Sequence, residues 1–199
     1  IRSLDPLLRL SKNGRVFTIT SKNELSFIID LFKKGKKQKA LAEGLKLSKR
    51  QKDDPNLSNT LGIIYRSLKK WNLSLNHYNQ ALSKEPQNAS FLNNKANVLR
   101  EIGSLNEAIK YYILAIEANP QNPLYHCNLA KVYNDNLNFK KAELSAKNAQ
   151  KLDPLNFEVF NNLGLALEGQ NKPHAAETAY TQALSIENKN PQAHTNIGK

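Results

Sequence analysis

Short polar residues recur every 34 positions along this chain, and this spacing constrains the fold more than any other property. They are Asp54, Asn88, Asn122, Asn156 and Asn190. Asp and Asn favour helix N-caps because their side chains accept hydrogen bonds from the first free backbone N–H groups of a helix. Proline follows three of them, at Pro55, Pro123 and Pro191, where its missing N–H removes no hydrogen bond. Each of the five positions is therefore expected to begin a helix.

Small residues recur in the same register and predict closely packed helix pairs. Eight residues past the caps stand Gly62, Ala96, Ala130, Gly164 and Gly198. Twenty past stand Ser74, Ala108, Ala142 and Ala176, and twenty-seven past stand Ala81, Ala115, Ala149 and Ala183. Large side chains occupy the complementary places, at Tyr65, Leu99, Tyr133 and Leu167 on the first helix and at Tyr78, Tyr112 and Tyr180 on the second. Pro86, Pro120 and Pro154 then end the second helices, since proline cannot continue a helix.

This pattern resembles the tetratricopeptide repeat, a helix–turn–helix unit of about 34 residues. The resemblance implies an all-α, right-handed α-solenoid. It covers four repeats at 55–88, 89–122, 123–156 and 157–190, with residues 191–199 beginning a further, truncated repeat. We expect helices near 22–34, 37–51, 55–69, 72–84, 89–102, 105–118, 123–136, 139–151, 157–170 and 173–186.

The start of the chain departs from the repeat. Residues 21–54 read as a degenerate helix pair in which Ile28 and Leu47 occupy small-residue places and Gly44 an aromatic one. A terminal, atypical repeat shields the end of a solenoid. Residues 1–20 are expected to form an irregular arm, with a turn of helix in 1–10 and a run at 15–20 that alternates like a short strand. The other end stops inside a repeat, which predicts that this chain is a piece of a longer protein.

Composition narrows the function. The chain has one cysteine, Cys127, and four dispersed histidines, so neither a disulfide framework nor a local metal motif is expected. It shows no phosphate loop and no hydrolase or zinc-protease motif, so we expect a protein that is not an enzyme and has no cofactor, metal site or small-molecule substrate. It has no apolar run of about 20 residues and no leader, and we expect a cytoplasmic chain without membrane insertion.

Net charge is +12, of which residues 1–54 carry +8. The basic block 33–39 is read as a solvated helix end rather than a nucleic-acid site, because no exposed aromatic residues are interleaved with it.

Asparagine recurs six residues past the caps, where first helices of such a stack face a concave groove. Asn94, Asn128, Asn162 and Asn196 hold this place and Thr60 departs from it. The column resembles the asparagine ladder of protein O-linked N-acetylglucosamine transferase, which holds target polypeptides, since an amide offers both donors and an acceptor. The expected peptide-binding residues are Asn59, Asn93, Asn94, Asn97, Asn128, Lys131, Asn161, Asn162 and Asn196. The competing interpretation is that these amides bond a neighbouring helix or their own turn.

A second family resemblance fails. Tetratricopeptide domains that hold the acidic tails of heat-shock chaperones use a two-carboxylate clamp, with Lys five residues past a cap and Asn nine past. Here the five-past places are Asn59, Asn93, Cys127 and Asn161, and only Asn97 fits the nine-past place. The clamp is therefore not assembled.

Two functions remain at this level. The first is a protein-interaction scaffold that binds an extended peptide or a partner helix in its groove. The second is a non-catalytic targeting arm of a larger enzyme, of glycosyltransferase, sulfotransferase or oxygenase type, with its catalytic domain beyond residue 199. Expected partners are proteins or peptides, and open solenoid ends also allow self-association.

Overall fold

A computed structural model describes residues 8–10, 16–18 and 21–187. Two short strands, β1 (Leu8–Leu10) and β2 (Val16–Thr18), pair antiparallel. The strand expected in 15–20 is confirmed. The helical turn expected in 1–10 is wrong at Leu8–Leu10, where the backbone pairs with β2 instead.

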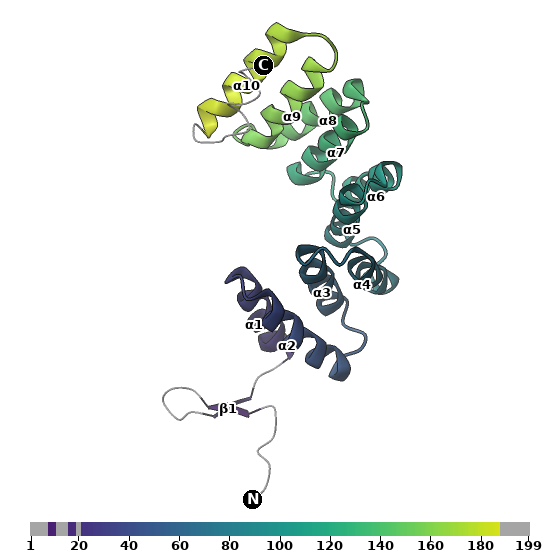
Figure 1. The fold of residues 1–199 in the computed structure, drawn as a ribbon, viewed down its shortest axis with the longest axis vertical. Helices are drawn as coiled ribbons and strands as arrows, with labels where there is room; N and C mark the ends of the chain where they lie inside the picture. The colour runs from purple at the N-terminus through teal and green to yellow at the C-terminus, as the bar shows by residue number, and fades with distance from the viewer. Residues whose placement is uncertain (1–7, 11–15, 19–20, 188–199) are drawn as a thin grey trace, which may run out of the picture. The chain divides into compact units, whose positions relative to one another are not determined.

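The ten described helices form five antiparallel pairs in sequence order (Figure 1). They are α1 (Ser21–Lys33), α2 (Lys37–Arg50), α3 (Pro55–Ser67), α4 (Trp71–Lys84), α5 (Ala89–Glu101), α6 (Leu105–Ala118), α7 (Pro123–Asp135), α8 (Phe139–Leu152), α9 (Phe157–Glu168) and α10 (Pro173–Ile186). All lie within two residues of the expected bounds. The all-α solenoid class is confirmed.

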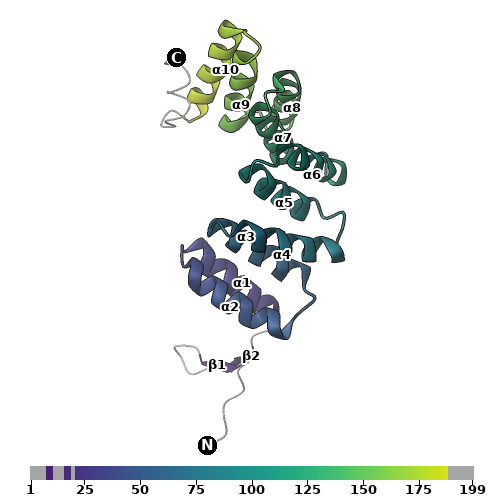
Figure 2. The same ribbon diagram turned by 45° about the vertical axis from the view of Figure 1, so that its right-hand side comes forward.

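The chain divides into two compact units, residues 1–84 (unit 1) and 85–199 (unit 2). Unit 1 stacks α1 against α2 and α3, and α3 against α4 (Figure 2). Unit 2 repeats this arrangement, since each helix from α5 to α10 contacts the next, and α7 also contacts both α5 and α9. Each unit therefore has its own core.

The caps predicted from the sequence are present in the described residues. Asp54 accepts from the backbone N–H groups of Asn56 and Leu57, and Asn88 does the same for the first turn of α5. Asn122 and Asn156 each accept one bond. Asn190 lies outside the described residues. These bonds satisfy N–H groups that a helix leaves without partners, which explains why these helices begin where they do.

A residue with positive φ occupies the turn inside every pair. These residues are Gly35, Lys69, Gly103, Leu137 and Asn171, with φ between 56° and 81°. They are spaced by 34 residues, so the period of the four regular repeats also holds in α1–α2. The left-handed conformation is costly for side chains other than Gly, Asn or Asp, and Leu137 and Lys69 adopt it because the helices on both sides fix the turn.

Tight seams hold each regular pair together. A Cβ on Gly62 would lie 2.6 Å from the ring of Tyr78, and one on Gly164 would overlap the ring of Tyr180. The alanines at the equivalent places, Ala96 and Ala130, are completely buried. Small residues are therefore required because an aromatic ring or a second backbone occupies the space beside them.

Candidate functional site

The first helices of successive pairs in unit 2 are joined by side-chain hydrogen bonds between residues 35 positions apart. The Nδ2 of Asn128 on α7 donates to the Oδ1 of Asn93 on α5, at 2.8 Å. The Nδ2 of Asn162 on α9 lies 3.4 Å from the carbonyl oxygen and 3.3 Å from the Sγ of Cys127 on α7. Residues six past one cap thus bond residues five past the preceding cap, as the competing interpretation of the asparagine column predicts.

Further links of the same spacing join α5 and α7. The hydroxyls of Ser90 and Tyr125 lie 3.3 Å apart. The Nε of Arg100 donates to the Oδ2 of Asp135 at 2.6 Å. These contacts, with Asn128–Asn93, hold the two helices at both ends and in the middle.

The predicted asparagines differ in exposure. The side chains of Asn93, Asn161 and Asn162 are buried, at 4%, 6% and 4% exposure, whereas Asn94 and Asn128 are half-buried. The column expected to face a concave groove is therefore closed to solvent at Asn162. Its amide is covered because it bonds Cys127, and its own backbone oxygen accepts from the Nδ2 of Asn134.

Asn128 keeps hydrogen-bonding capacity that its contact with Asn93 does not use. An Asn amide has two N–H donors and an oxygen acceptor, and the bond to Asn93 uses one donor. This bond also fixes the rotamer of Asn128, which lowers the entropy lost when a ligand binds. The half-buried amide can therefore both accept and donate hydrogen bonds.

Two more predicted residues lie on the same helices. Asn97 on α5 accepts from the buried Tyr112 hydroxyl through its Oδ1, at 2.7 Å, which orients the amide. Lys131 on α7 is exposed. We call Asn94, Asn97, Asn128 and Lys131 the asparagine face of α5 and α7.

Two further predicted residues belong to other parts of the chain. Asn59 belongs to α3 in unit 1, and Asn196 lies outside the described residues. Within unit 2, the structure brings Asn93 and Asn128 together and sets Asn161 and Asn162 into the packing around α9.

Cys127 has no reactive character in this setting. The side chain is 2% exposed, and burial, with a smaller contribution from Glu158, raises the pKa of its thiol to about 11. The thiol is therefore neutral near pH 7 and is a weak nucleophile. Among the described residues, no group of three or more His, Cys, Asp or Glu side chains is placed to hold a metal ion.

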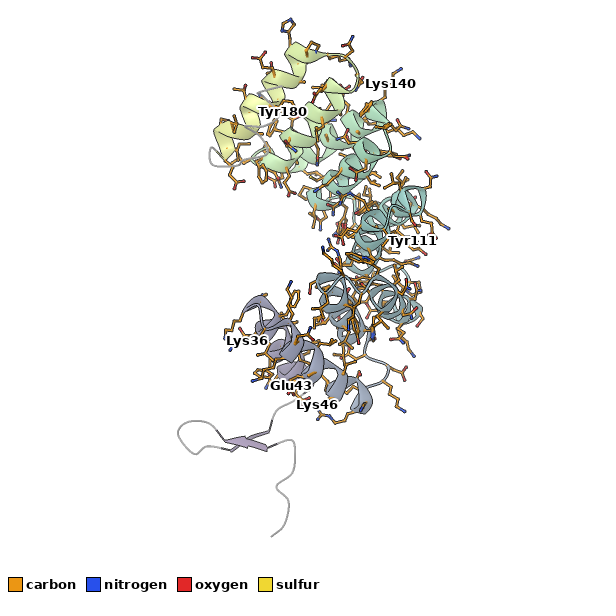
Figure 3. All side chains as sticks on the ribbon, viewed as in Figure 1. Lys36, Glu43, Lys46, Tyr111, Lys140 and Tyr180 are labelled. Carbon is orange, nitrogen blue, oxygen red and sulfur yellow. The ribbon has the colours of Figure 1, made fainter. Side chains whose placement is uncertain are left out.

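A contact between Lys95 and Tyr111 was missed in the sequence. The Nζ of Lys95 lies 2.7 Å from the Tyr111 hydroxyl and 4.0 Å from the centroid of its ring. Figure 3 labels Tyr111 on α6. Tyr111 is half-buried. The signal was the lysine itself, which stands at 95 where Leu61, Leu129 and Leu163 hold the equivalent places, and which needs a polar partner when half-buried.

A pocket of about 690 Å³ lies between α1 and α3 in unit 1. Leu25, Ile29 and Phe32 line it from α1, and Asn59 and Ile63 line it from α3. We call it the α1–α3 pocket. The repeat pattern does not predict this pocket, because residues 21–54 are interpreted from it only as a helix pair that shields the end of the stack.

In the described part of the chain, no helix combines the length and the apolar character needed to cross a membrane.

Solved structures with the same fold include several tetratricopeptide proteins. MamA from Desulfovibrio magneticus RS-1 is 18% identical, with a TM-score of 0.75 over 86% of this chain and 97% of that one. YrrB, described as a TPR protein with an unusual peptide-binding site, is 16% identical, with a TM-score of 0.72 over 90% and 93%. TTC0263, a thermophilic TPR protein from Thermus thermophilus, is 20% identical, with a TM-score of 0.72 over 90% and 97%. At these identities the likeness concerns the fold.

Family models agree with the structures. Residues 77–110 and 127–193 match models described as the tetratricopeptide repeat, and residues 96–136 match one described as the TPR repeat. No curated protein sequence matches the chain. The caps, the tight seams and these matches all point to one conclusion: the chain belongs to the tetratricopeptide repeat family, whose members act as protein-interaction scaffolds.

Proposed function

We propose that this protein binds an extended peptide segment of a partner protein on the asparagine face of α5 and α7. The observation that carries the proposal is the half-buried Asn128, whose rotamer is fixed by Asn93 and whose remaining N–H and oxygen are unused by that bond. An extended peptide presents alternating N–H and C=O groups, so an oriented amide can bond its backbone whatever its side chains are.

The neighbouring residues support the same use. Asn94 and Asn97 lie on α5 and are half-buried, and the Tyr112 hydroxyl orients Asn97. Lys131 adds a positive charge to α7 without burying it. The fold shared with YrrB, described as having a peptide-binding site, also favours this class of ligand.

The test uses peptides selected for binding to the full chain from a display library of random 12-residue sequences. Affinity for a selected peptide is measured by fluorescence anisotropy on wild type and on Asn128→Ala. A neutral hydrogen bond contributes roughly 0.5–1.5 kcal/mol net, so losing one or two should weaken binding about 2- to 100-fold. The loss should depend weakly on salt, because no formal charge is removed.

Asn106→Ala is the matched control, since Asn106 is an exposed amide on α6 of the same unit and should leave affinity unchanged. If selection yields no peptide, or if Asn128→Ala and Asn106→Ala bind the selected peptide as wild type does, the amides of this face serve packing alone and the proposal is wrong.

A further inference from the structure

We propose that the α1–α3 pocket is a second docking site, for an extended segment in which two apolar side chains adjoin two or more carboxylates. This inference rests on the proposed function, because it assigns part of the same peptide-binding role to unit 1. It goes further by naming the chemistry of the partner, which the asparagine face does not specify.

The walls of the pocket are apolar. Leu25, Ile29 and Phe32 lie along one side of α1, and Ile63 faces them from α3. All four are half-buried, and Leu25 and Phe32 also pack against the core of unit 1. Covering this apolar surface with apolar side chains of a ligand removes it from water, which favours binding.

The length of the pocket fixes the length of the segment. Leu25 and Lys33 both line it, and eight residues of helix span about 12 Å. An extended chain advances about 3.3 Å per residue, so about four residues fit. Successive side chains of such a segment point to opposite sides, so its two apolar anchors stand two residues apart.

One end of the pocket is basic. Lys33 ends α1 and lines the pocket. The Nζ of Lys37 lies 3.4 Å from the carbonyl oxygen of Ser67, the last residue of α3, so the turn between α1 and α2 lies beside the end of α3. Lys36 is on this turn (Figure 3). Three full positive charges outweigh the partial negative charge of the helix ends.

The nearby carboxylates are already engaged. Asp54 lines the other end of the pocket, but its side chain caps α3. Asp30 pairs with Lys34 at 2.7 Å. Within the residues that the structure describes, no carboxylate pairs with Lys33 or Lys36. Carboxylates of a partner would therefore complement this end of the pocket.

The probes are two dye-labelled octapeptides, Gly-Ser-Leu-Ser-Phe-Asp-Glu-Glu and its reversed order, because either chain direction fits an extended segment. Binding to the full chain is measured by anisotropy, and amide shifts in 15N NMR locate the site. We expect a Kd on the order of 100 µM for one probe. Replacing its acidic residues by Lys, or its Leu and Phe by Ser, should each weaken binding at least tenfold.

Lys33→Glu tests the basic end, and Lys49→Glu is its control. Both lysines are exposed on unit 1, and Lys49 lies on α2 outside the residues that line the pocket. Lys33→Glu should weaken binding about fivefold or more, whereas Lys49→Glu should change it less than twofold. Shifts should concentrate at Ile29, Phe32 and Ile63.

Other results overturn the inference in distinct ways. Shifts confined to the asparagine face would leave the proposed function standing and remove the pocket from it. Equal loss in both lysine variants, together with binding of a single-stranded oligonucleotide, would show a general anion surface. If neither probe binds below 1 mM, the pocket does not take this segment, whatever the library peptides do on α5 and α7.

Discussion

The helix pairs α1–α2 and α9–α10 share one architecture but differ in which of the two helices carries the glycine and which carries the large side chain. In α9–α10, the first helix supplies Gly164 and the second supplies Tyr180, whose ring fills the space beside the glycine. In α1–α2, the first helix supplies Ile28 and the second supplies Gly44. A Cβ on Gly44 would meet the Leu61 side chain of α3 at 2.7 Å and Ile28 at 3.9 Å.

The difference shows that a small residue is required wherever a large neighbour lies beside it, and that this neighbour belongs to the same pair for Gly164 and to the next pair for Gly44. Residues 21–54 look degenerate when each position is compared with its counterpart. In the structure Ile28 is 2% exposed and Leu47 1%, and the turn at Gly35 has the same positive φ as the other turns. The first pair is therefore a compensated version of the same packing.

The largest effect that separates the two seams should come from adding one methyl group to each glycine. Gly164→Ala forces a Cβ against the rigid ring of Tyr180 and should destabilise by about 1–3 kcal/mol. Gly44→Ala meets a terminal methyl group of Leu61 on α3 rather than a ring, and it gains helix propensity of about 1 kcal/mol over Gly, so its net change should be within about 1 kcal/mol. Urea unfolding measures both. Equal destabilisation would show that the two seams are equally rigid.

The next largest difference in stability is expected at the repeat position six residues past the cap. Asn162 in α9 is buried and bonded to Cys127, whereas Ser26 holds the equivalent place in α1 and is exposed. Asn162→Ala leaves a buried carbonyl without that donor and should cost about 1–2 kcal/mol. Ser26→Ala should stay within about 0.5 kcal/mol. Thermal unfolding of the two variants measures the difference, and a neutral Asn162→Ala would contradict a structural role for this amide.

Substitutions in the turns of the two pairs should produce a smaller difference in stability. Gly35 has φ 75° in α1–α2, and Asn171 has φ 59° in α9–α10. Gly35→Ala places a Cβ in the left-handed region and should cost about 1 kcal/mol. Asn tolerates that region, so Asn171→Gly should change stability by only a few tenths of a kcal/mol. Chemical denaturation measures both. A Gly35→Ala variant as stable as wild type would mean that the first turn relaxes.

The smallest expected effect is the loss of stability at low pH that comes from protonation of Glu143. Hydrogen bonds from Lys147 and Gln170 lower the pKa of Glu143 from 4.5 to about 2. The bond from Gln170 also joins α8 to the turn between α9 and α10. The folded state favours the ionised carboxylate, so this stabilisation is complete above about pH 4.5 and is lost as pH falls toward 2. Glu143→Gln should lower Tm by about 2 °C at pH 6, and the difference from wild type should vanish near pH 2.

Glu43→Gln on α2 is the comparison variant for this pH series. Glu43 pairs with Lys46 at 3.1 Å, and that lysine is 67% exposed, so water screens the pair and its contribution is small. The contrary outcome is a Tm of Glu143→Gln that stays below that of wild type by the same amount at every pH. That result would show that Glu143 stabilises through packing rather than through its charge.

The sequence predicted the helices because their causes are local. Asp54 and Asn88 cap the helices that follow them, and capping depends on residues two or three positions away. Gly62 and Tyr78 belong to one helix pair, so their complementarity also repeats with the period. Such features are visible in a chain read one repeat at a time.

The site was predicted less well because its contacts cross between repeats. The period places Asn128 and Asn162 at one position, but their partners are Asn93 and Cys127 in the preceding repeat, and the partner decides how much of each amide is covered. The α1–α3 pocket likewise depends on Ile29 and Ile63 meeting across two pairs. Only the three-dimensional arrangement distinguishes these cases.

The links between α5 and α7 also have a mechanical consequence. Ser90 and Arg100, which bond Tyr125 and Asp135, are ten residues apart on α5, a distance of about 15 Å along the helix. Two hydrogen bonds this far apart along α5 oppose rotation of α7 against it, because such a rotation would lengthen both bonds. Elastic deformation of unit 2 should therefore occur as bending across this contact rather than as rotation within it, so the asparagine face keeps its alignment while the stack flexes.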